Sequence, residues 1–216
     1  MQKTAVIFDM DGVLTDSEPL ICAAAMAMFA EQGVVVAESD FTPFVGAGEN
    51  RYIGGVAEKH GVTLDLPVAK ARTYEIYLDL VPQQLRMFPG ADSLVEACKA
   101  AGLQVAVASS ADQIKIRANL AAIGLPPAYW DAVVSGEELV RLKPAPDLFL
   151  EAARRMQVLP ETCVVIEDAI NGVAAAKAAQ MRCVAVETSF PAAQLGAADC
   201  VRATIDLIRL TDITGA

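Results

Sequence analysis

The chain has 216 residues, enough for one large domain or for a domain with a smaller insert, and 54% of them are hydrophobic. Its formal net charge of −10 argues against a nucleic-acid-binding surface, which would need a basic patch. No apolar run reaches the roughly 18 residues of a membrane span, so we expect no membrane insertion.

The N-terminus and the cysteines indicate a soluble, intracellular chain. The first residues lead directly into a predicted strand and show no signal or transit pattern. The five cysteines are scattered, with no CxxC pair, which favours buried thiols in a reducing compartment. We therefore expect a cytoplasmic protein. The sequence does not determine the oligomeric state, and a monomer is favoured.

The first predicted element is a strand, and a helical segment follows it. The apolar run from Thr4 to Phe8 is typical of a buried parallel strand. Helical patterns follow near residues 20–32, 50–60 and 68–81, with no convincing strand between them. This order predicts an all-α cap domain at residues 17–86, inserted into a core domain formed by residues 1–16 and 87–216.

Strand and helix patterns alternate from about residue 89 to the C-terminus. Such alternation is typical of an α/β fold with a doubly wound, mostly parallel, Rossmann-like sheet. Apolar runs predict strands at residues 104–108, 132–134, 163–166 and 183–186. Helical patterns lie around these runs, at residues 91–101, 111–123, 146–156 and 170–180.

Acidic residues follow the first predicted strand. Asp9 stands at its carboxyl end, where open α/β sheets bind their ligands. Asp11 comes two residues later, next to a turn that Gly12 permits. Two carboxylates this close repel each other, and a divalent cation or a shared proton would relieve the repulsion. By itself, the motif is equally consistent with a solvated turn rich in aspartate.

Two further motifs offer groups that bind phosphate. Ser109 and Ser110 follow the strand predicted at residues 104–108, and the N-terminus of the next helix favours an anion. Lys143 lies in a loop stiffened by two prolines, so a fixed ammonium next to Asp9 could stabilise phosphoryl charge. The alternatives are a serine that only caps a helix and a lysine that is simply exposed.

A pair of acids, Glu167 and Asp168, follows the strand predicted at residues 163–166. Their oxygens suit magnesium, a hard cation, whereas Asp168 alone is also consistent with a helix N-cap. The carboxyl ends of parallel strands meet at one edge of the sheet, so all four motifs should face one crevice. Together they supply a nucleophile, an acid or base, a phosphate clamp, a cation and a metal site, which phosphoryl transfer requires.

The four motifs, in this order and spacing, resemble those of the haloacid dehalogenase superfamily. The stretch from Asp9 to Pro19, DMDGVLTDSEP, is highly specific, and the similarity covers nearly the whole chain. The helical insert resembles the cap of the branch that contains β-phosphoglucomutase and phosphoglycolate phosphatase. The resemblance implies a phosphatase that hydrolyses a small phosphorylated metabolite with Mg2+ as its cofactor.

The resemblance also implies a role for each site residue. Asp9 would be the nucleophile that forms an aspartyl-phosphate, and Asp11 would be the general acid and base. Ser109 and Lys143 would bind the phosphoryl group. Further implied residues are Gly12 and Ser110 next to the phosphate and, as ligands of Mg2+, Asp9, the backbone carbonyl of Asp11, Asp168 and, directly or from behind them, Glu167.

The chain departs from the mutase pattern of that superfamily at three positions. The mutases have a histidine early in the first cap helix, where this chain has Pro19 to Cys22. Asp112 replaces a lysine after the second motif, and Glu49 replaces an arginine that binds sugar phosphate, for which Arg51 could substitute. His60, the single histidine, is expected on the surface. These differences favour a phosphatase over a phosphomutase.

Three alternatives to a phosphatase stay open. A phosphomutase would return the phosphoryl group to the sugar. A haloacid dehalogenase would use the same Asp9 but needs neither Asp11 nor a metal. A non-enzymatic regulatory module is the third, because residues 46–57 and 106–112 resemble the haloacid dehalogenase-like N-terminal domain of a plant chloroplast protein. The chain would then be part of a longer plastid protein and lie in the chloroplast.

Overall fold

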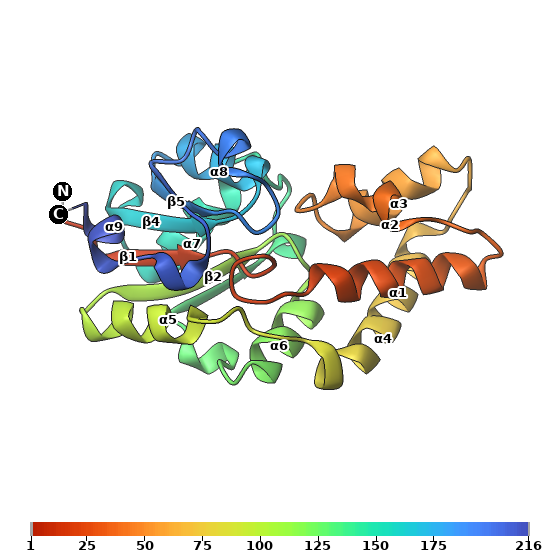
Figure 1. Cartoon of the computed structure of the whole chain (residues 1–216), viewed down its shortest axis with the longest axis horizontal. Helices are drawn as coiled ribbons and strands as arrows, with labels where there is room; N and C mark the ends of the chain where they lie inside the picture. The colour runs from red at the N-terminus through yellow and green to blue at the C-terminus, as the bar shows by residue number, and fades with distance from the viewer. Residues whose placement is uncertain (1, 216) are drawn as a thin grey trace.

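The structure, a computed structural model, describes residues 2–215 and consists of an α/β core with a helical segment next to it (Figure 1). Over these residues, six strands form one parallel sheet in the order β3-β2-β1-β4-β5-β6. The strands are β1 Ala5–Phe8, β2 Gln104–Ser109, β3 Ala132–Ser135, β4 Cys163–Glu167, β5 Arg182–Val186 and β6 Cys200–Arg202.

Alternating side chains of the sheet form two apolar layers. Val6 and Phe8 of β1 belong to one layer, Ala5 and Ile7 belong to the other, and all four are fully buried. Helices cover both faces, as a buried parallel sheet requires. The first face is covered by α5 Ala91–Ala100, α6 Gln113–Ala122 and α9 Leu210–Thr214, and the second by α7 Asp147–Met156 and α8 Ile170–Ala178.

The helical segment has an apolar core of its own, in which Phe41 packs against the rings of Phe29 and Tyr52. The segment lies beyond the end of the sheet toward which β1 runs (Figure 1), and we call it the cap. Its helices are α1 Glu18–Glu31, α2 Glu38–Phe41, α3 Glu49–Lys59 and α4 Leu66–Gln84.

Two connections that run side by side join the cap to the core. Thr15 forms an antiparallel bridge with Met87, and the N–H of Asp16 donates to the carbonyl of Arg86 at 2.9 Å. The chain therefore enters and leaves the cap at one place. The assignment of residues 17–86 as a separate domain stays a prediction.

The predicted fold class, a doubly wound parallel sheet with an inserted helical cap, is confirmed. The sequence patterns missed β6, α2 and α9, because these short elements lack the continuous apolar run by which the other short strands were predicted. The five cysteines, which all lie within the described residues, carry free thiols. Between residues 2 and 215, no helix is both long and apolar enough to cross a membrane.

Candidate active site

Residues from the four sequence motifs converge on one cavity between the sheet and the cap. β1 pairs with β2 on one side and with β4 on the other, in a register that places Phe8 opposite Val107 and Ile166. The loops after these strands therefore start at the same edge of the sheet. The predicted residues that line the cavity are Asp9, Asp11, Gly12, Ser109, Ser110, Lys143 and Asp168.

The ammonium of Lys143 lies between two carboxylates of the core. Its Nζ is 2.9 Å from Asp9 Oδ2 and also contacts Glu167 Oε1. Burial raises the pKa of the Asp9 carboxyl to about 8, against the opposing effect of Lys143. Burial would lower the pKa of Lys143, but the two carboxylates raise it above its ordinary value, so the lysine keeps its charge. The site thus holds a fixed cation next to the candidate nucleophile.

Three buried carboxylates have the chemistry of a magnesium site. One oxygen from each of Asp9, Glu167 and Asp168 lies within 4.8 Å of the others. Burial and the charges of Glu167 and Asp9 raise the pKa of Asp168 well above its ordinary value, and a bound cation would reverse this shift. Glu167 already accepts hydrogen bonds from Lys143 and from the N–H groups of Asp168 and Ala169. Asp9 and Asp168 are therefore the better candidates for direct ligands.

Two glycines leave the space that these carboxylates occupy. Gly12 has a φ of +78°, and a Cβ there would lie 1.9 Å from Asp168 Oδ2. At Gly172, in the first turn of α8, a Cβ would lie 1.8 Å from Glu167 Oε1. A side chain at either position would push a carboxylate out of the site. This clash explains why both positions are glycine.

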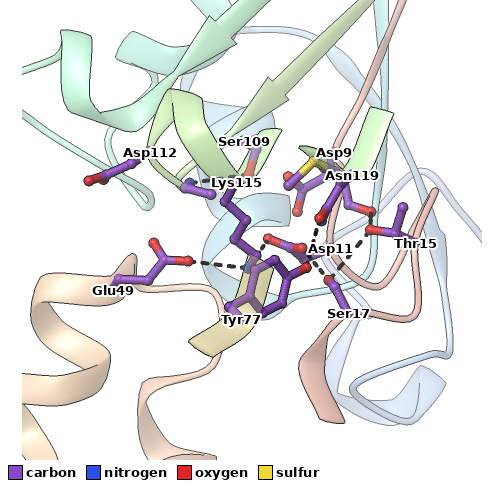
Figure 2. A network of polar contacts seen from close by, with 12 residues as sticks. Asp9, Asp11, Thr15, Ser17, Glu49, Tyr77, Ser109, Asp112, Lys115 and Asn119 are labelled. Carbon is purple, nitrogen blue, oxygen red and sulfur yellow. Dashed lines mark hydrogen bonds and ion pairs between the residues drawn. The ribbon is translucent and has the colours of Figure 1, made fainter. Parts of the chain in front are cut away.

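Asp11 belongs to a second polar network, which Figure 2 shows. Asp11 Oδ2 lies 2.9 Å from Lys115 Nζ, and its Oδ1 accepts a hydrogen bond from the Ser17 hydroxyl. Lys115 Nζ also lies 3.2 Å from Oε1 of Glu49, the first residue of cap helix α3. Burial would lower the pKa of Lys115, but Asp11 and Glu49 raise it well above its ordinary value. The network joins the candidate acid–base residue to the cap.

The sequence analysis did not identify Lys115 as a site residue. On α6, hydropathy alone predicts that Ile114 is buried and that Lys115 is exposed, and the structure shows the reverse. Ile114 is 49% exposed, whereas Lys115 is only 2% exposed. A signal was nevertheless present in the spacing. Lys115 and Asn119 are four residues apart and directly precede Ile116 and Leu120, the buried apolar pair of this helix, so all four lie on one face.

The two serines of the second motif lie at the cavity, close to the start of α6. Ser109 Oγ accepts a hydrogen bond from the N–H of Ala111 at 3.2 Å. Ser110 Oγ is buried and has no hydrogen-bond partner among residues 2–215. A buried hydroxyl without a partner is unusual in proteins and suits a ligand oxygen. The role of both serines in phosphate binding stays a prediction.

The structure does not bring Arg51 into the cavity. Its guanidinium pairs with Glu58 at 2.9 Å and lies 4.9 Å from the centre of the Phe44 ring, with most of the side chain exposed. The geometry therefore gives no support to Arg51 as a substitute for a sugar-phosphate-binding arginine. His60 is exposed, as expected, and pairs with Asp40 at 2.7 Å.

The cap closes the cavity in this structure. The volume of this cavity, about 50 Å³, has room for a few water molecules but not for a whole sugar phosphate. Polar contacts join α4 of the cap to the start and middle of α6. Tyr77 Oη donates to Asn119 Oδ1 at 2.7 Å, Lys70 pairs with Asp112 at 2.6 Å, and the Asp112 N–H donates to Tyr74 Oη at 3.3 Å.

The molecule thus belongs to the class of capped α/β proteins with a buried carboxylate–lysine site at the edge of a parallel sheet. Residues 3–180 match a family model described as haloacid dehalogenase-like hydrolase. The chain therefore belongs to this family, and the resemblance predicted from its motifs is confirmed.

Two named proteins and one solved structure illustrate the relationship. The chain is 51% identical over 215 residues to suppressor of quenching 1, chloroplastic, of Arabidopsis thaliana. The match covers 97% of this chain but only 20% of the length of that protein. It is 32% identical to hexitol phosphatase B of Escherichia coli, over 99% of this chain and 95% of that protein. The structure of CbbY from Rhodobacter sphaeroides with xylulose-(1,5)bisphosphate matches with a TM-score of 0.90 at 25% identity, over 99% of each chain. The predicted class, a hydrolase of the phosphatase type, is confirmed at the level of the family.

Proposed function

We propose that the protein is a Mg2+-dependent phosphatase that hydrolyses the phosphate monoester of a small carbohydrate through an aspartyl-phosphate. The observation that carries the proposal is the position of Lys143, whose ammonium lies 2.9 Å from Asp9 Oδ2 at the sheet edge beneath the cap. The carbohydrate part is supported by hexitol phosphatase B, which is named for such a substrate and matches nearly the full length of both chains.

The proposed reaction has two steps, which share Asp9 and Asp11. In the first, a carboxylate oxygen of Asp9 attacks phosphorus, the bond from phosphorus to the leaving oxygen breaks, and Asp11 gives that oxygen a proton. In the second, water attacks the phosphorus of the aspartyl-phosphate and gives a proton to Asp11. The bond between phosphorus and Asp9 breaks, which releases inorganic phosphate and restores both carboxyl groups.

The other residues bind the phosphoryl group and exclude bulk water. Lys143 and the hydroxyls of Ser109 and Ser110 would hold the phosphoryl oxygens, where fixed donors stabilise developing charge. When bound, Mg2+ would offset the negative charge of the phosphoryl oxygens. The residues that would hold it are Asp9, Asp168, the backbone carbonyl of Asp11 and, behind them, Glu167.

Phosphate release from p-nitrophenyl phosphate tests the proposal. We expect turnover with Mg2+ and none in excess chelator. Asp9→Asn should abolish turnover and leave the fold intact, because an amide is nearly isosteric with a carboxylate but a far poorer nucleophile. Asp79→Asn, the same change at an exposed position of α4, is the matched control. Full activity in chelator, or a near-normal rate for Asp9→Asn, would contradict the proposal.

The role of Asp11 has a separate test. Asp11→Asn should slow the hydrolysis of an alkyl phosphate such as glycerol phosphate by roughly 10²–10⁴-fold, because the amide gives up no proton to the leaving oxygen. An aryl phosphate, whose leaving group needs little protonation, should lose much less. Comparing kcat for the two substrates checks this. An equal loss for both would show that Asp11 has another role.

A second candidate is a regulatory module of a longer chloroplast protein. It is favoured by the 51% identity to suppressor of quenching 1, of which this chain spans about a fifth. The isolated chain would then fold but turn over no compound in a screen of phosphorylated carbohydrates with Mg2+. The same screen detects a phosphomutase, which would convert a sugar monophosphate into its positional isomer without releasing phosphate.

A further inference from the structure

Buried polar atoms without partners are concentrated at the cap side of the active-site cavity. Glu18 Oε1, Glu49 Oε2 and Tyr52 Oη have no hydrogen-bond partner among the described residues. Glu18 comes from α1, the other two come from α3, and all three line the cavity. On the core side of the cavity, Ser110 Oγ also has no hydrogen-bond partner among the described residues. Since buried polar groups are nearly always hydrogen-bonded, these atoms are available to water or to a polar ligand that enters the cavity.

The cations of this cavity are already paired. Among the lining residues that the structure describes, the positively charged ones are Lys143, at the phosphoryl position, and Lys115, on the cap side. Lys115 lies between Asp11 and Glu49, and Figure 2 shows that Glu49 reaches it from the cap ribbon. Glu49 also stands in the first turn of α3, where its charge offsets the positive end of the helix. The cap side therefore offers no free positive charge to a ligand.

A neighbouring cavity continues this pattern. It has a volume of about 370 Å³ and shares Gly12, Glu18, Val45, Tyr52 and Ser189 with the first. Its charged lining residues are acids, Asp16, Glu18 and Glu38, with no lysine, arginine or histidine among the described residues. A leaving group that reaches this space meets aromatic rings, carboxylates and the hydroxyl groups of Thr42, Thr188 and Ser189.

We propose, building on the phosphatase function above, that the substrate is a monophosphate of an uncharged polyol and that Glu49 is the residue that selects for it. Hydroxyl groups can donate hydrogen bonds to the unpartnered oxygens of Glu18 and Glu49, whereas an ionised carboxylate can only accept. A second anion would also face these carboxylates while Lys115 is occupied. A site whose buried acceptors need donors discriminates against a ligand that lacks them.

Glucitol 6-phosphate and gluconate 6-phosphate test the proposal, because they share the carbon chain and the phosphate position and differ at C1, which is a hydroxymethyl group in one and a carboxylate in the other. With Mg2+, we expect kcat/KM for the glucitol ester to exceed that for the gluconate ester by at least about 10-fold. Glu49→Gln frees Lys115 for the carboxylate, so this ratio should fall by about 10-fold. Glu75→Gln on α4 removes the same charge from an exposed ion pair with Arg72 and should leave the ratio unchanged.

Each outcome bears on one of the two proposals. A lower ratio in Glu49→Gln, with an unchanged ratio in Glu75→Gln and normal thermal unfolding of both, supports selection by Glu49. If p-nitrophenyl phosphate is hydrolysed but gluconate 6-phosphate is used as well as glucitol 6-phosphate, the polyol inference is wrong and the phosphatase stands. The inference is also wrong if neither ester is hydrolysed, or if Glu49→Gln keeps the wild-type ratio. If Mg2+ gives no phosphate release from p-nitrophenyl phosphate, the phosphatase proposal itself fails.

Discussion

Two lysines are buried at the active site, and they are held in different ways. Lys143 lies between Asp9 and Glu167, which both stand at the ends of sheet strands. Lys115 lies between Asp11 of the core and Glu49 of the cap. We call these sets the core triad and the core–cap triad. The sheet holds the first together, whereas the second would lose Glu49 if the cap moved away from the core.

This difference separates the residues that hold the phosphoryl group from those that contact the cap. Breaking a buried ion pair costs most when the remaining charge has no route to water. Glu167 is 0% exposed at the carboxyl end of β4 and has no such route, whereas Glu49 would regain water if the cap moved away from the core. We therefore expect the core triad to determine stability and the binding of the phosphoryl group. We expect the core–cap triad, through Asp11 and Glu49, to determine proton transfer to the leaving group and which leaving group is accepted.

The largest expected effect comes from breaking the core triad with Lys143→Met. Turnover of p-nitrophenyl phosphate should fall by roughly 10²–10³-fold or more, because a fixed positive charge at the phosphoryl group is lost. The free energy of unfolding should fall by about 3–5 kcal/mol, because Glu167 stays buried without its partner. Steady-state kinetics and urea unfolding measure the two effects.

A second substitution separates these two losses. Adding Glu167→Gln to Lys143→Met removes the unpaired charge, so stability should recover while turnover stays low. Arg141→Met, an exposed position in the same loop, is the control. Recovery of turnover together with stability would mean that Lys143 acts only as a structural residue.

The core triad was predictable from the sequence, and the core–cap triad was not. Asp9 and Glu167 stand at the ends of apolar runs, and parallel pairing alone brings strand ends to one edge of the sheet. Lys115 is 104 residues from Asp11 and 66 from Glu49, and its contact with Glu49 depends on how the cap rests on the core. No local hydropathy pattern encodes that position.

An intermediate effect is expected from Lys115→Met, which breaks the core–cap triad. Stability should fall by about 2–3 kcal/mol, less than for Lys143→Met, because Glu49 can turn to water with the cap. Backbone amides of α3 should exchange with deuterium faster, whereas those of β1 should not. Arg117→Met, an exposed position on the same helix, is the control. A stability loss equal to that of Lys143→Met would show that the cap does not open in this way.

The smallest expected effect tests whether the core–cap triad extends beyond its charged residues. Tyr77 Oη donates to Asn119 Oδ1 at 2.7 Å between the cap and α6, and its ring centre lies 5.6 Å from Lys115 Nζ. Tyr77→Phe keeps the ring and removes this hydrogen bond, so the free energy of unfolding should fall by about 1 kcal/mol, with turnover unchanged.

The double variant Tyr77→Phe with Lys115→Met makes this last test sharper. When two residues stabilise the same interface, replacing both can reduce the free energy of unfolding by less than the sum of the two single replacements. Since both side chains tie the cap to α6, we expect the double variant to lose less stability than the two single variants added together. Urea unfolding of all four proteins gives the coupling free energy. Full additivity would mean that the tyrosine and the lysine hold the cap separately, and that Glu49 is the cap residue on which the position of Lys115 depends.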